Sequence, residues 1–104
     1  MTNNTATLQV IGMGEAIDFN NIKVGDILTG HYMGKYGFIG EVIADNHHSI
    51  YHAGTYTNNV AFTVKLHSDC ERPQNGLFTT GSEMKIYLSD NNATKIVFHS
   101  RNMN

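Results

Sequence analysis

The stretch Val24 to Ile43, VGDILTGHYMGKYGFIGEVI, decides the fold class because it has the pattern of two strands joined by a tight turn. Residues 27–32 contain Ile, Leu, Thr and Tyr, which are common in strands. Gly25 comes just before this first strand and permits a backbone angle that other residues resist. The stretch therefore predicts an antiparallel hairpin that opens at Gly25-Asp26.

The second half of the hairpin follows a glycine-bounded turn. Gly34-Lys35-Tyr36-Gly37 has a glycine at each end and predicts the turn. The chain then returns as a strand from Phe38 to Ile43. Gly40 interrupts that strand, which often marks a bulge or a close approach of two backbones.

Alternating apolar residues predict three further strands. Residues 60–67 place Val60, Phe62, Val64 and Leu66 on one face and polar or small residues on the other. The same period of two recurs at Met84, Ile86 and Leu88, and again at Ile96 and Phe98. Such alternation is typical of a sheet with one buried face. The expected core comprises Ile27, Phe38, Val42, Val60, Phe62, Val64, Leu66, Met84, Ile86 and Phe98.

The remaining segments connect these strands. Thr7 to Ile11 is expected to form a short strand, and residues 15–21 a turn or 3₁₀ segment capped by Asp18 or Asn20. Ser68 to Gly76 is expected to be a loop, and Ser100 to Asn104 a polar tail. Six or seven short strands separated by turn signals predict an all-β domain over residues 1–104, a small antiparallel barrel or rolled sheet.

Composition excludes several classes of function. The formal net charge is −2 and charged residues make up 15% of the chain, so no basic footprint for non-specific nucleic-acid binding is present. Cys70 is the single cysteine, which precludes an intramolecular disulfide and suits a reducing compartment. The sequence shows neither a membrane-spanning apolar run nor a signal peptide. We therefore expect a cytoplasmic protein.

The central hairpin also resembles a known group of proteins. Phe19, then Val24-Gly25-Asp26, a strand, a glycine turn and Phe38-Ile39-Gly40-Glu41-Val42 look like the first half of Src-homology-3-like (SH3-like) barrels. The resemblance is to uncharacterised small barrel proteins of phages and mobile elements, and it covers roughly residues 19–43. It implies a compact barrel that binds a partner rather than an activity. The chain lacks the Lys- and Arg-rich strand face of nucleic-acid-binding barrels.

Histidines form the first candidate site, in the loop of residues 45–59. His47, His48 and His52 lie within six residues of one another. Imidazole is the commonest metal ligand, and Asp45 and Cys70 are possible further ligands for zinc. Nothing in their spacing requires an ion, and an exposed loop or a pH-sensitive partner contact explains the histidines as well. We expect no metal and no cofactor.

Tyrosines form the second candidate site. Tyr32, Tyr36, Tyr51 and Tyr56 fall on predicted turns and loops, where large, stiff side chains with a polar tip suit recognition. They are also able to cap the core or to stack nucleic-acid bases. The sequence alone leaves these roles open.

No motif indicates an enzyme. Cys70 lies between Asp69 and Glu71, and two acids beside a thiol disfavour the thiolate. No nucleophile elbow or phosphate-binding loop is present. Elemental analysis of the purified protein would test the remaining possibility, a metal-dependent enzyme.

The leading hypothesis is a non-enzymatic binding protein. Its specific form is a phage-encoded accessory protein that inhibits a host protein complex, of the anti-CRISPR or another counter-defence type. A homodimer is also expected, because a small sheet leaves an edge open. The expected partner-binding residues are Lys35, Tyr36, His47, His48, Tyr51, His52 and Tyr56. The alternative is a barrel that binds single-stranded nucleic acid or a nucleotide, which a contiguous positive groove with Lys35, Lys65 and Lys85 would favour.

Overall fold

The structure is a computed structural model that describes residues 7–46, 60–72, 76–87 and 94–102. Its elements are the strands β1 (Leu8–Met13), β2 (Ile27–Tyr32), β3 (Tyr36–Asp45), β4 (Phe62–Leu66), β5 (Cys70–Arg72), β6 (Gly76–Phe78), β7 (Glu83–Ile86) and β8 (Lys95–Asn102), and the 3₁₀ segments η1 (Gly14–Ala16) and η2 (Phe19–Asn21). No α-helix occurs in these ranges, and within them no helix is long and apolar enough to cross a membrane.

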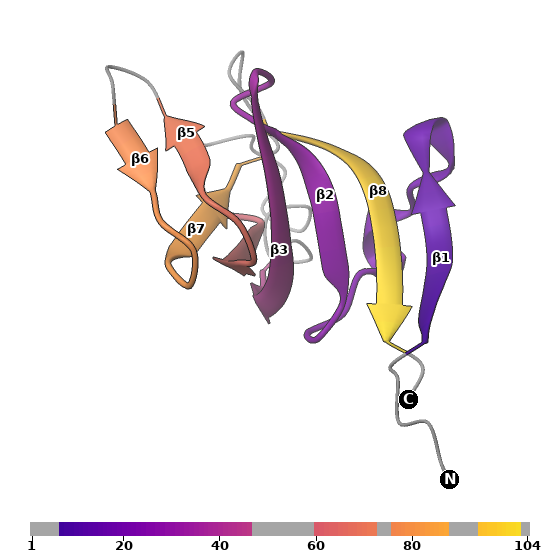
Figure 1. Cartoon of the computed structure of the whole chain (residues 1–104). Helices are drawn as coiled ribbons and strands as arrows, with labels where there is room; N and C mark the ends of the chain where they lie inside the picture. Colours follow the sequence, from indigo (N-terminus) through magenta and orange to yellow (C-terminus); the bar gives the residue numbers. More distant parts are fainter. Residues whose placement is uncertain (1–6, 47–59, 73–75, 88–93, 103–104) are drawn as a thin grey trace, which may run out of the picture.

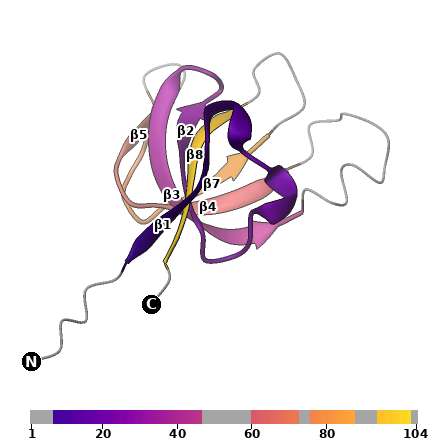
Figure 2. The ribbon, with the colours of Figure 1, turned by 90° about the vertical axis from the view of Figure 1, so that its right-hand side faces the viewer.

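Six strands form one antiparallel sheet in the order β1-β8-β2-β3-β4-β7, and β5 and β6 form a separate pair (Figure 1). The view from the β1 side shows the strands curling around a common interior (Figure 2). The predicted all-β fold class is confirmed. Of the two forms expected, the structure has the rolled sheet, because among the described residues β1 and β7 are the two ends of the strand order.

The central hairpin is confirmed as β2 and β3, but its turn lies earlier than predicted. Tyr32 pairs with Tyr36, so Tyr36 and Gly37 already belong to β3. Met33 and Gly34 occupy the turn, with φ angles of 54° and 75°, and the Lys35 amide donates to the Tyr32 carbonyl at 3.1 Å. Positive φ at both central positions is the geometry of a type I′ turn, which matches the twist of a hairpin. Gly25 has the expected positive φ, of 98°.

The core fills the concave side of the sheet. Seven of the ten residues expected there are buried: Phe38, Val42, Phe62, Val64, Leu66, Met84 and Ile86. Ile22, Leu28, Ala61, Cys70 and Ile96 complete the apolar core. Gly40 marks the close approach that its position in the strand indicated. A Cβ atom there would lie 2.8 Å from the Cβ of Val64 on the neighbouring strand.

Three core predictions are wrong, because Ile27, Val60 and Phe98 are only partly buried. Phe98 is displaced by a bulge in β8. Gly30 pairs with Ile96 and Thr29 with Phe98, so Val97 is an extra residue between them. The bulge turns Phe98 to the convex face and places His99 opposite the buried Leu28. Ile27 precedes Leu28 on β2 and therefore points to the convex face as well.

The connecting segments differ from expectation in two places. The predicted loop of residues 68–76 contains β5, whose Cys70 pairs with Phe78 of β6. The predicted tail beginning at Ser100 is instead the end of β8, which runs to Asn102. The predicted cap is confirmed, since Asp18 Oδ1 accepts a hydrogen bond from the Asn20 amide at 3.0 Å before η2.

Candidate functional site

The tip of the β2–β3 hairpin brings together the two predicted partner-binding residues that the structure describes. The Lys35 ammonium lies 5.5 Å from the centre of the Tyr36 ring, within the range of a cation–π contact. Lys35 is exposed, whereas Tyr36 is partly buried and packs against the core. The Tyr36 ring therefore contacts the Lys35 ammonium on one side and covers the core on the other.

Three contacts hold this tip in place. The Met33 amide donates to Thr94 Oγ1 at 3.2 Å, which fastens the turn to the residue before β8. The rings of Tyr32 and Phe78 meet edge to face, with centroids 5.4 Å apart. The Cys70 thiol is 3.8 Å from the Tyr36 carbonyl oxygen, a weak contact because the Glu71 carbonyl oxygen lies nearer to the same thiol, at 3.3 Å. The turn is thus supported by strands that are distant in sequence.

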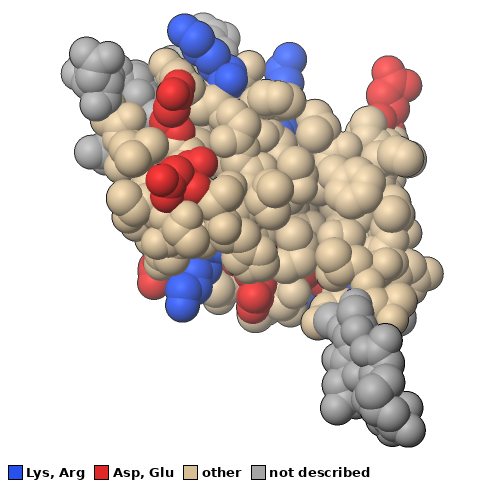
Figure 3. Space-filling view, in the orientation of Figure 1, with Lys and Arg blue, Asp and Glu red and all other residues tan. Residues whose placement is uncertain are grey.

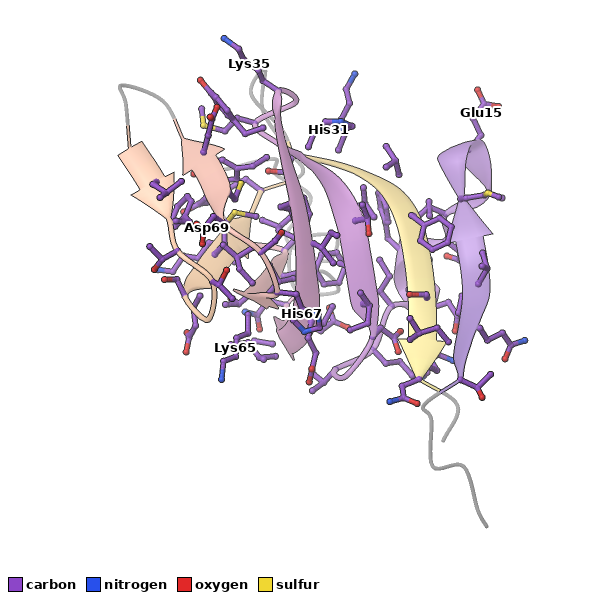
Figure 4. The ribbon with its side chains drawn as sticks, viewed as in Figure 1. Glu15, His31, Lys35, Lys65, His67 and Asp69 are labelled. Atoms are coloured by element: carbon purple, nitrogen blue, oxygen red, sulfur yellow. The ribbon has the colours of Figure 1, made fainter. Side chains whose placement is uncertain are left out.

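Two further cationic or titratable groups lie at the same end of the sheet. His31 pairs with Lys95 across β2 and β8, and both side chains are exposed. His31 and Lys35 project from this end together (Figure 4). We call His31, Lys35, Tyr36 and Lys95 the hairpin-end surface. In the space-filling view, basic side chains lie along this rim, and acidic side chains lie just below them on one side (Figure 3).

The remaining predicted partner residues, His47, His48, Tyr51, His52 and Tyr56, lie outside the described residues. Within the described ranges, no three His, Cys, Asp or Glu side chains are grouped so as to hold a metal ion. Asp45 ends β3 and Cys70 is buried beneath β3, where burial and then the charge of Glu71 raise the pKa of its thiol above the ordinary 9.0. A raised pKa disfavours the reactive thiolate.

The positive groove that would favour nucleic-acid binding does not form from the three named lysines. Lys35 and Lys65 lie at opposite ends of the sheet (Figure 4). Lys65 pairs with Glu41 on one side and with Glu83 on the other, and Lys85 lies two residues after Glu83 on β7. Because acidic residues flank Lys65, the lysines of β4 and β7 do not form part of a continuous positive surface that would attract nucleic acid.

A buried polar cluster is the main feature that the sequence did not predict. The Asp26 carboxylate is buried, and Glu41 pairs with Ile27 across the hairpin and not with Asp26. Asp26 Oδ2 lies 2.6 Å from His99 Nε2. Arg101 donates to both carboxylate oxygens, from Nε at 2.7 Å and from Nη2 at 2.9 Å. This two-point contact is the strongest geometry for an Arg–carboxylate pair.

The cluster connects the segment before β2 to the last strand. The Lys23 amide donates to Asp26 Oδ2 at 2.9 Å, and Arg101 Nη2 donates to the Asn21 carbonyl at 2.8 Å. Burial by itself would raise the pKa of Asp26. Hydrogen bonds from Arg101, His99 and the Lys23 amide outweigh burial and hold that pKa below its ordinary value of 3.8. Asp26 is therefore an anion that organises the fold, and its burial closes it to a substrate.

His99 is fully buried, and its Nδ1 atom has no hydrogen-bond partner among the described residues. Its Nε2 atom faces Asp26, so one ring nitrogen is fixed by the carboxylate. The sequence offered one signal for the cluster, the Gly-Asp that opens the central hairpin. The sequence around His99 and Arg101 gave no such signal, because both residues follow the β8 bulge in a segment of polar residues.

Comparison with protein-family models, with curated proteins and with solved structures gives no match to this chain.

Proposed function

We propose that this chain is a non-enzymatic protein that binds another protein through the hairpin-end surface. The observation that carries the proposal is the Lys35–Tyr36 pair. An exposed ammonium rests on a ring that is itself anchored in the core. Loops and turns held by a rigid sheet are where binding residues concentrate.

The charges of the surface indicate the kind of partner that fits. Lys35 and Lys95 are exposed cations and His31 adds a third titratable side chain. An acidic patch on the partner would complement them and would speed the encounter. Tyr36 supplies an aromatic group at the base of the contact, and aromatic residues are enriched among those that dominate binding energy.

The specific form of the proposal is a phage-encoded accessory protein that binds and inhibits a host protein complex, of the anti-CRISPR or another counter-defence type. It is supported by the small size of the chain and by the resemblance of residues 19–43 to small barrels of phages and mobile elements. A host complex would be met in the host cytoplasm. Inhibition by a protein of this size requires only that it cover a functional surface of the target.

The test is a pull-down from host lysate with mass spectrometry, using matched charge neutralisations at the two ends of the sheet. Lys35→Gln removes the cation over Tyr36, whereas Lys65→Gln makes the same change at the far end without placing a third carboxylate between Glu41 and Glu83. We expect Lys35→Gln to reduce recovery of the partner at least tenfold and Lys65→Gln to leave it near the wild-type level. Equal recovery with both variants would contradict the proposal.

A further inference from the structure

The two outermost strands of the sheet differ in how they are protected. β7 alternates the exposed charged residues Glu83 and Lys85 with buried apolar ones, and charges on an edge discourage pairing with another chain. β1 has the sequence LQVIGM and carries no charge. Among the described residues, the backbone of β1 makes its ladder with β8 alone. β1 is therefore the unprotected edge.

The side chains of β1 add an apolar strip to this edge. Leu8, Val10 and Met13 are 58%, 51% and 55% exposed. Their register opposite Asn102, Ser100 and Phe98 places all three on the convex face of the sheet. The front of the molecule over β8 and β1 is uncharged, with Glu15 at its upper rim (Figures 3 and 4).

We propose that β1 pairs antiparallel with β1 of a second copy of this chain. Any partner strand that carried a charge into this contact would leave that charge without a counterion on β1. A second copy brings an equally uncharged strand, and a two-fold contact requires the same surface on both partners. The pairing joins two six-stranded sheets into one and satisfies the free side of both edges.

The bulge in β1 determines which residues of the two β1 strands lie opposite one another in the proposed dimer. The ladder with β8 shifts between Val10 and Gly12, so residues 8–10 form the regular part of the strand. A two-fold axis at Gln9 places Leu8 opposite the partner subunit's Val10, with both side chains on the convex face. The two Gln9 carboxamides then meet on the axis, where each is able to donate and to accept a hydrogen bond.

The proposed β1–β1 contact involves few residues, so we expect it to be weak. A three-residue ladder with a few apolar side chains lies at the low end of protein interfaces, below roughly 1,200 Å² in total. We therefore expect a reversible dimer with a dissociation constant in the micromolar range. It is independent of the proposed partner binding, because β1 is not part of the hairpin-end surface.

The test is sedimentation equilibrium from low micromolar to millimolar concentration. The wild-type mass should rise from 11.5 kDa toward twice that value. Val10→Lys places a charge in the contact and should keep the mass at 11.5 kDa. Val24→Lys is the matched control, since Val24 is 64% exposed in the turn before β2, and it should dimerise as the wild type does. A wild type that stays at 11.5 kDa throughout overturns the proposal.

Two further variants keep the test decisive. Val97→Lys alters the exposed convex side of β8 without touching β1, so loss of the dimer there and not in Val10→Lys would show face-to-face stacking and overturn the edge contact. If Val10→Lys does not fold, Gln9→Cys replaces it. With oxidised glutathione added as the two-electron oxidant, the two introduced thiols on the axis should form an intermolecular disulfide and release reduced glutathione. Val24→Cys should not form such a dimer, and equal crosslinking of both variants would also refute the proposed register.

Discussion

Asp26 Oδ2 and His99 Nε2 lie 2.6 Å apart in the interior, although the two residues are 73 positions apart in the chain. Arg101, two residues beyond His99 on β8, binds the same carboxylate with two nitrogens. This contact joins the start of the central hairpin to the last strand. The sheet order explains it, because β8 is inserted between β1 and β2.

The first prediction concerns Asp26. Asp26→Asn removes the charge but keeps the size, and it leaves Arg101 without its counterion in a mostly buried site. We expect a loss of about 3–5 kcal/mol in the free energy of unfolding, the usual effect of breaking a buried pair. Urea denaturation at neutral pH measures it. Asp69→Asn is the control, because Asp69 is an exposed aspartate that bonds only Thr80 among the described residues, and it should change stability little.

The second prediction concerns how the Asp26 carboxylate makes the free energy of unfolding depend on pH. The pKa of Asp26 is lower in the folded protein than its ordinary 3.8, so the unfolded chain binds the proton more readily. The stabilisation is therefore complete above pH 3.8 and disappears as the pH falls through the lower, folded value. Urea denaturation of the wild type across this acidic range should show a steeper loss than Asp26→Asn, which lacks the titrating group. Parallel curves for the two proteins would contradict the prediction.

The third prediction checks the register of β8. Phe62 is fully buried, and Phe62→Ala should cost about 3–5 kcal/mol of stability because it empties an aromatic site in the core. Phe98 was expected in the same core but lies partly exposed on the convex face. Phe98→Ala should therefore cost clearly less than Phe62→Ala in chemical denaturation. Equal losses would show that Phe98 packs inside and that the bulge at Val97 is absent.

The fourth prediction concerns Gly40. Gly40→Ala should destabilise the protein by about 1–3 kcal/mol, the usual effect of overpacking, since the new methyl group would lie 2.8 Å from Val64. Val64→Ala removes Cγ2, one of the two Val64 atoms at 2.8 Å, but keeps Cβ, so adding Gly40→Ala to that variant should cost less than adding it to the wild type without becoming neutral. A thermodynamic cycle from urea denaturation measures the difference. Additive losses would mean that the strain comes from the Val64 Cβ atom or from the backbone, and not from the Val64 Cγ2 methyl group.

The fold class followed from the sequence because alternation of apolar residues is a local property. Val64, Leu66, Met84 and Ile86 were placed in the core correctly on that pattern alone. The alternation pattern could not predict the bulges, because an extra residue in one strand is recognised only when the pairing with the neighbouring strand is known. A single one, at Val97, was enough to exchange Phe98 for His99 in the interior.

Only part of the candidate site could be predicted from the sequence. The glycine turn and its neighbouring Lys35 and Tyr36 were recognised from local chemistry, although the turn itself was placed too late in the chain. The buried cluster was not recognised, because its members are joined only when the last strand enters the centre of the sheet. Polar residues near a chain end, such as Arg101, look solvated until the strand order is known.

The last prediction separates recognition from packing among the tyrosines of the expected binding surface. Tyr36→Ala removes a ring that packs against the core, so it should lower the free energy of unfolding as well as weaken partner binding. Lys35→Ala leaves that packing in place and should affect binding alone. Tyr51 and Tyr56 lie outside the described residues, and we expect Tyr51→Ala and Tyr56→Ala to keep the stability of the wild type.

Binding is then measured by calorimetry with the partner identified in the pull-down. At least one of the three tyrosine variants should lose about 2 kcal/mol or more of binding free energy, the scale of an aromatic hot spot. For Tyr36, the binding loss must exceed what the unfolded fraction explains, and Tyr36→Phe, which keeps the ring, should restore most of the stability. If all three variants bind as tightly as the wild type, the recognition surface lies elsewhere on the molecule.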